Sequence, residues 1–148
     1  MVKYFAYGSN LDTKRMIERG VVFTSRQFGI LKDYKLVFNK KTSKNNSKEG
    51  YANIIKYKGS IVEGAIYEIT EESISLLDKY EGYPTHYSRE YLDIEVSDRT
   101  IRCIVYVANS EKLQEGLKPS KEYFSKILEG KDLFTEEYYN NLIKTEVL

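Results

Sequence analysis

The first stretch with residues suited to chemistry is a glycine turn near the front of the chain. Residues 2–7 are mostly β-branched, aromatic or small, which favours a buried strand, and Gly8 then stops that strand. Ser9 and Asn10 are types that cap helix N-termini, and residues 11–19 carry the apolar spacing of a short helix. Such a turn aims unpaired N–H groups at one point, where an anion or an oxyanion can bind. An ordinary capped connection has the same pattern, and the local sequence alone favours it.

The second candidate is Glu81, at the end of a predicted helix over residues 71–81. Thr70 is a capping residue, Glu71 and Glu72 suit the first turn, and Gly82 ends the helix. The helix dipole disfavours an anion at this C-terminal end, so the proton affinity of the Glu81 carboxylate rises. A general acid or base that works near neutral pH needs that property. A solvent-facing glutamate is the safer interpretation of this residue taken alone.

No convincing nucleophile or metal site accompanies these two segments. His86, the only histidine, falls in a predicted turn over residues 83–86 without a paired acid or nucleophile, and we expect it at the surface. Cys103, the only cysteine, lies in an apolar row of a predicted strand, where thiols are usually inert packing. A Cys–His pair is not excluded by the sequence, but the strand context argues against it. One cysteine and one histidine exclude an internal disulfide and a zinc site built from these residues.

Composition narrows the class of protein. The 148 residues suit a single domain over 1–148, and a net charge of +1 demands neither a nucleic acid nor a membrane as partner. The front of the chain has no apolar signal segment, and no apolar run approaches the ~20 residues of a membrane span, so we expect a cytoplasmic protein. Residues 40–50 contain no large apolar side chain and predict a solvated loop.

The elements that must position these residues alternate between strands and helices. A two-residue Lys58–Gly59 turn predicts a hairpin between residues 51–57 and 60–69, and Lys32–Asp33 predicts a turn or bulge in an earlier strand. A second hairpin is expected around residues 97–99. The full expectation is about six strands and four helices, the strands near 2–7, 21–38, 51–57, 60–69, 87–96 and 100–108, the helices near 11–19, 71–81, 120–129 and 136–144. The class is α+β, with a curled or closed mixed sheet and helices around it.

These pieces, in this order, resemble the γ-glutamylcyclotransferase family, also called AIG2-like. Residues 4–11, Tyr-Phe-Ala-Tyr-Gly-Ser-Asn-Leu, are similar to the family's glycine-turn signature. Leu77-Asp78 followed by Glu81-Gly82 is similar to the segment that bears the family's catalytic glutamate. Pro119-Ser120 and then Tyr123 resemble the late helix that supplies a substrate-contacting tyrosine. The resemblance spans essentially the whole chain.

The resemblance implies a small mixed β-barrel of about six strands flanked by helices, with the active site in a cavity at the barrel's end. It implies Glu81 as the catalytic residue. The backbone N–H groups of the glycine turn would hold the oxyanion and the α-carboxylate, and a tyrosine would hydrogen-bond the γ-glutamyl head. The substrate-binding residues so implied are Tyr7, Gly8, Ser9, Asn10, Leu11 and Tyr123.

The reaction implied by the family is intramolecular cyclisation of a γ-glutamyl amide to 5-oxoproline, with release of the free amine. The substrate's own α-amine is the nucleophile, so no serine or cysteine nucleophile, metal or organic cofactor is required. The expected partner is a small γ-glutamyl molecule, either a γ-glutamyl-amino acid or a γ-glutamylamine. A non-catalytic module of the same fold that binds a small metabolite is the alternative. The sequence leaves open the released amine, the oligomeric state, a homodimer included, and the role of the loop at 40–50.

Overall fold

The computed structural model describes residues 1–148 and contains a closed five-stranded β-barrel. The strands follow each other around the barrel in the order β1, β3, β2, β4, β5. Neighbours are antiparallel except for β5, which pairs in parallel with β1 through Ile104 and Tyr4 and so closes the barrel. The strand bounds are Val2–Ala6 for β1, Phe23–Lys41 for β2, Gly50–Ile69 for β3, Tyr87–Val96 for β4 and Arg99–Ala108 for β5. The prediction of a mixed barrel is confirmed, with one strand fewer than expected.

The number of strands differs because the hairpin turn predicted at Lys58–Gly59 is wrong. β3 runs through these residues, and both of its halves pair with the long β2 rather than with each other. The pairing shifts register between Lys32 and Tyr34, where Asp33 has a positive φ of 64° and Gly59 one of 89°. The Gly59 N–H donates to the Asp33 carboxylate over 3.0 Å. The glycine conformation and the predicted irregularity at residues 32–33 therefore belong to one bulged region inside a continuous pair of strands.

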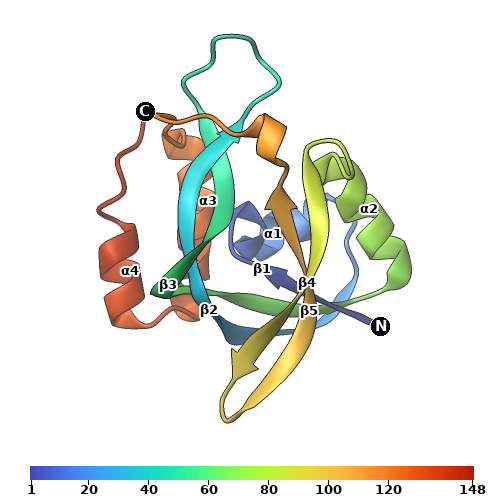
Figure 1. Cartoon of the computed structure of the whole chain (residues 1–148). Coiled ribbons are helices and arrows are strands. Elements are labelled where there is room, and N and C mark those ends of the chain that lie inside the picture. The colour runs from blue at the N-terminus through green and yellow to red at the C-terminus, as the bar shows by residue number, and fades with distance from the viewer.

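Four α-helices surround the barrel, α1 Thr13–Glu18, α2 Glu71–Glu81, α3 Lys121–Leu128 and α4 Glu136–Leu142. In Figure 1, α2 lies on one side of the barrel, and α3 and α4 lie on the other. The predicted caps of the last three helices are confirmed, because the side chains of Thr70, Ser120 and Thr135 each accept a backbone N–H three residues later. No helix is both long enough and apolar enough to cross a membrane.

The first helix begins later than predicted. Residues 9–11 form a separate 3₁₀ turn, and Asp12, rather than Ser9 or Asn10, caps α1 by accepting the Lys14 N–H over 3.1 Å. α2 ends as expected at Gly82, which adopts the left-handed conformation with φ of 70°.

The barrel interior and the undersides of the helices form one apolar core. Phe5, Val62, Tyr67 and Ile94 are fully buried within it. Both faces of β5 are buried between Cys103 and Tyr106, because the sheet curves around the core while helices and loops cover parts of its outside. Glu63 is the buried carboxylate of this region, and it accepts the N–H of Thr135 over 2.8 Å, which fastens the start of α4 to β3.

Candidate active site

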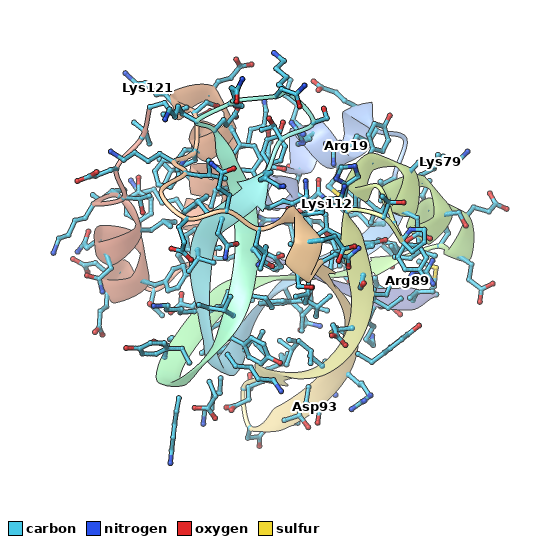
Figure 2. All side chains as sticks on the ribbon, turned by 45° about the horizontal axis from the view of Figure 1, so that its top comes forward. Arg19, Lys79, Arg89, Asp93, Lys112 and Lys121 are labelled. Carbon is cyan, nitrogen blue, oxygen red and sulfur yellow. The ribbon has the colours of Figure 1, made fainter.

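A cavity of about 830 Å³ opens at one end of the barrel. Its walls come from the glycine turn, α1, the facing ends of β2 and β3, the end of α2, and the start of α3. Figure 2 shows Arg19 and Lys79, both of which line the cavity, at some distance from Asp93 on the β4–β5 hairpin. The structure brings Tyr7, Gly8, Ser9, Asn10, Glu81 and Tyr123 of the predicted site to this cavity.

Gly8 lies where a side chain has no room. A Cβ there would be 3.2 Å from the Ala52 Cβ and 3.6 Å from the Tyr123 hydroxyl oxygen, so close approach, rather than a positive φ, explains the glycine. The Gly8 N–H makes no hydrogen bond within the chain. Leu11, the remaining residue of the predicted binding turn, does not line the cavity: its N–H donates to the Gly8 carbonyl over 3.0 Å, and its side chain is fully buried in the core.

Asn10 holds the wall together with its side-chain amide. Its Nδ2 donates to the Tyr4 hydroxyl over 2.9 Å, and its Oδ1 accepts from Arg19 Nη1 over 3.1 Å. The Tyr67 hydroxyl donates to the Asn10 carbonyl over 2.8 Å. Because both ends of the amide are engaged and the residue is 3% exposed, Asn10 orients Arg19 and Tyr4 beside the cavity.

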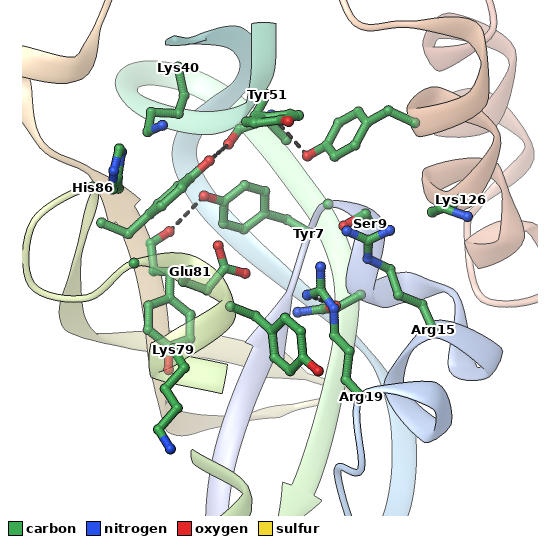
Figure 3. A pocket seen from close by; sticks show the side chains of 18 of the residues that line it. Tyr7, Ser9, Arg15, Arg19, Lys40, Tyr51, Lys79, Glu81, His86 and Lys126 are labelled. Atoms are coloured by element: carbon green, nitrogen blue, oxygen red, sulfur yellow. Dashed lines mark hydrogen bonds between the residues drawn. The ribbon is translucent and has the colours of Figure 1, made fainter. Parts of the chain in front are cut away.

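Glu81 is the cavity carboxylate whose surroundings shift its pKa. It is half-buried at the end of α2, its side chain points toward Tyr7 (Figure 3), and no hydrogen bond or ion pair of the chain involves its carboxylate. Burial raises the pKa of Glu81, and the nearby cations Arg19, Arg15 and Lys40 oppose that rise. The predicted direction of the shift agrees with the structure, with desolvation as its main cause.

Tyrosines form the floor around this carboxylate. The Tyr123 hydroxyl accepts the Ala52 N–H over 3.1 Å, and the Tyr87 hydroxyl donates to the Ala52 carbonyl over 2.8 Å, so the start of β3 is held from both sides. The Tyr7 hydroxyl donates to the Tyr106 carbonyl over 2.6 Å. Burial, followed by the charge of Glu81, raises the pKa of Tyr7, which stays a neutral phenol.

The sequence prediction missed all five cations that line the cavity: Arg15, Arg19, Lys40, Lys79 and Lys126. Arg15 and Arg19 lie four residues apart, one turn along the short α1 region, and this spacing was the available signal. The Arg15 Nε is buried without a hydrogen-bond partner. Lys40 was placed in the solvated loop, yet it belongs to β2 and is 3% exposed. Its signal was the alternation of Leu36, Phe38 and Lys40 on one face of the strand.

The lone histidine and cysteine separate in the structure. His86 lies in the predicted turn and is partly exposed, but it also lines the cavity, and its ring packs on Gly82, where a Cβ would come within 2.8 Å of it. Cys103 is 1% exposed and does not line the cavity, and burial raises the pKa of its thiol to about 12. No group of three or more His, Cys, Asp or Glu side chains is placed to hold a metal ion.

Comparison with known proteins assigns the chain to one family. A family model described as "Gamma-glutamyl cyclotransferase, AIG2-like" matches residues 4–126. The γ-glutamylcyclotransferases of Bos taurus and Mus musculus are 33% and 32% identical over 134 residues, which cover 86% of this chain and 68% of each relative. A solved γ-glutamyl cyclotransferase superposes with a TM-score of 0.84 at 26% identity, covering 99% of this chain and 89% of that one. YkqA from Bacillus subtilis also superposes with a TM-score of 0.84 at 26% identity, over 97% of this chain and 53% of its own. The chain therefore belongs to the γ-glutamylcyclotransferase, AIG2-like family.

Proposed function

We propose that this protein cyclises a γ-glutamyl amide to 5-oxoproline and releases the free amine, with Glu81 as general acid and base. The observation that carries the proposal is a desolvated carboxylate without a partner, in the same cavity as the free N–H of Gly8. The relatives named γ-glutamylcyclotransferase support the class of reaction. The chemistry needs no nucleophile from the protein, which agrees with the inert surroundings of Cys103.

The proton balance gives Glu81 a two-way role. The α-amine nitrogen of the substrate bonds to the γ-carbonyl carbon, and the bond from that carbon to the amide nitrogen breaks. The α-ammonium gives up two protons in becoming a lactam N–H, and the departing nitrogen takes up two in leaving as an ammonium. Glu81 carries these protons and ends unchanged, with no water consumed. A raised pKa suits this role, because proton transfer in both directions is most efficient when the pKa of the group lies near the working pH.

The glycine turn supplies the binding site for the γ-glutamyl head. The unpartnered Gly8 N–H donates to the oxyanion that forms on the γ-carbonyl, and the Arg15 guanidinium, with its unpartnered Nε, pairs with the α-carboxylate. The Tyr123 hydroxyl already accepts the Ala52 N–H, so its own proton is free to donate to the head. Holding amine and carbonyl in one bent conformation can supply up to roughly 7–11 kcal/mol of the barrier.

Glu81→Gln tests the assignment, because glutamine keeps the shape and cannot carry the proton. We expect 5-oxoproline release to fall by about 10²–10⁴-fold. Glu90→Gln is the matched control, since Glu90 is an exposed carboxylate on β4 outside the cavity, and it should retain wild-type turnover. A fully active Glu81→Gln variant would reject the role of Glu81. Thermal stabilisation of the wild type by γ-glutamyl compounds without any turnover would instead identify a binding module.

A further inference from the structure

Lys40 is a buried cation without a carboxylate partner. It is 3% exposed, its ammonium donates to the Lys41 carbonyl, and no ion pair of the chain includes it. Its Nζ lies 5.8 Å from the centre of the Tyr51 ring and 5.6 Å from that of the Tyr87 ring. Burying a charge without a counter-ion is costly, so a position of this kind suits a ligand that brings the missing anion.

Lys40 lies beside a second polar side chain of the cavity that lacks a partner. The neighbouring His86 has a buried Nδ1 without a hydrogen-bond partner, and both residues line the cavity. Figure 3 shows Lys40 and His86 on one side, Arg15, Ser9 and Lys126 on the other, and Tyr7 with Glu81 between them. The cavity thus presents positive charge on both sides of the carboxylate proposed to carry the protons.

A γ-glutamyl head carries one carboxylate and can occupy only one of these two sides. In the proposed function, on which this inference rests, the head lies at the glycine turn beside Arg15. The amine that leaves then lies toward Lys40. We propose that Lys40 is a specificity-determining residue that binds an anionic group on the departing amine. The preferred substrates are then γ-glutamyl derivatives of amines that bear a carboxylate, such as α-amino acids.

The same geometry disfavours the other class of leaving group. A neutral amine leaves the Lys40 ammonium desolvated and unpaired in the complex, and a cationic amine adds repulsion. A carboxylate in that place forms a charge-assisted hydrogen bond in surroundings that are shielded from water. From the usual free energy of one such bond, we expect kcat/KM to be about 10- to 100-fold higher for a substrate whose leaving amine bears a carboxylate.

γ-Glutamyl-alanine and γ-glutamyl-ethylamide test the proposal, because their leaving amines differ only by the carboxylate. We expect wild-type kcat/KM to be at least about tenfold higher for γ-glutamyl-alanine. In Lys40→Met, which keeps most of the apolar stem, that ratio should fall by about 10- to 100-fold through a higher KM for γ-glutamyl-alanine. Lys40→Arg should restore most of the ratio. Comparing ratios between variants cancels the intrinsic difference in leaving-group chemistry.

Lys126→Met is the matched control, since it removes a cavity cation from the opposite side and should leave the ratio unchanged. Equal loss for both substrates in Lys40→Met, or a wild-type preference for the ethylamide, would overturn the role of Lys40 while cyclisation stands. Where Lys40→Met does not fold, Lys40→Gln, which keeps a polar head on a stem of similar length, serves for the same comparison of ratios. Failure of wild-type protein to form 5-oxoproline from either substrate would refute the proposed function, and this inference with it.

Discussion

Asp78 is the residue that we expect to hold Glu81 in place, and its replacement gives a quantitative test. Its Oδ1 accepts from Arg89 Nε over 3.0 Å and from the Tyr106 hydroxyl over 2.6 Å, and its Oδ2 accepts from Arg89 Nη2. Figure 2 shows Arg89 reaching from β4 to α2. Because Glu81 follows three residues later on the same helix, Asp78 fastens the end of α2 that bears Glu81 to β4 and β5.

The loss of stability expected for Asp78→Ala depends on how far this hydrogen-bond network is shielded from solvent. The Arg89 and Asp78 side chains are 24% and 17% exposed, so the pair lies between a surface and a buried ion pair. Asp78→Ala leaves a guanidinium and a phenol without their acceptor, at a cost of about 2–3 kcal/mol. At roughly 2–4 °C per kcal/mol for a chain of this size, Tm should fall by about 4–12 °C. Asp78→Asn keeps one acceptor and should lose about half as much.

Turnover should respond more strongly than stability. A displacement of about 1 Å at a reacting group can cost 10²-fold, so we expect kcat of Asp78→Asn to fall by about 10- to 100-fold with little change in KM. Thermal melts by circular dichroism and 5-oxoproline release at 25 °C measure the two effects. Asp93→Asn is the control: Asp93 lies on β4, the strand that also carries Arg89, and it pairs with Arg102 over 3.3 Å at the exposed surface. An Asp78→Asn protein with wild-type kcat and a Tm within about 1 °C of the wild type would refute the reasoning.

Two further outcomes follow from the site. In pH–rate profiles, kcat/KM should be lost on the acid side at a pH above the ordinary carboxyl range, because activity falls as Glu81 is protonated and its pKa is raised. Arg19→Gln should move this loss to still higher pH, because it removes a cation that lowers the pKa of Glu81. Arg19→Lys keeps the charge and should not move it. Gly8→Ala should raise KM by about tenfold or more in a folded protein. The added Cβ would lie 3.2 Å from the Ala52 Cβ and 3.6 Å from the Tyr123 hydroxyl, where we propose that the γ-glutamyl head binds. An unchanged KM in steady-state kinetics would contradict this.

Features that depend on a few neighbouring residues were predictable from the sequence. Thr70 caps α2 and Gly82 ends it because both effects act within one turn of helix. The β4–β5 hairpin also lies where expected, with Ser97 in the left-handed conformation at its turn. In each case the decisive interaction joins residues that are close in sequence.

Features that depend on distant pairing were not predictable in the same way. Gly59 carries the positive φ expected of a hairpin turn, but the chain uses that conformation for a bulge opposite Asp33. The choice between turn and bulge is made by β2, which supplies partners to both halves of β3. Lys40 was misplaced for a related reason, because its burial depends on a cavity whose other walls come from α1, α2 and α3.

The meeting of Gly8 and Glu81, more than 70 residues apart, follows from matched lengths. β1 pairs antiparallel with β3 from Val2 opposite Ile69 to Ala6 opposite Ala65, so β3 ends at the far end of β1 from the glycine turn. α2 must then bring the chain back along the barrel. Its 11 residues rise about 16 Å, which is close to the roughly 17–20 Å that β1 and its exit span, and its last residue is Glu81. A helix one turn shorter would leave the carboxylate about 5 Å from its place, so the position of this acid at the very end of α2 is a geometric requirement of the site.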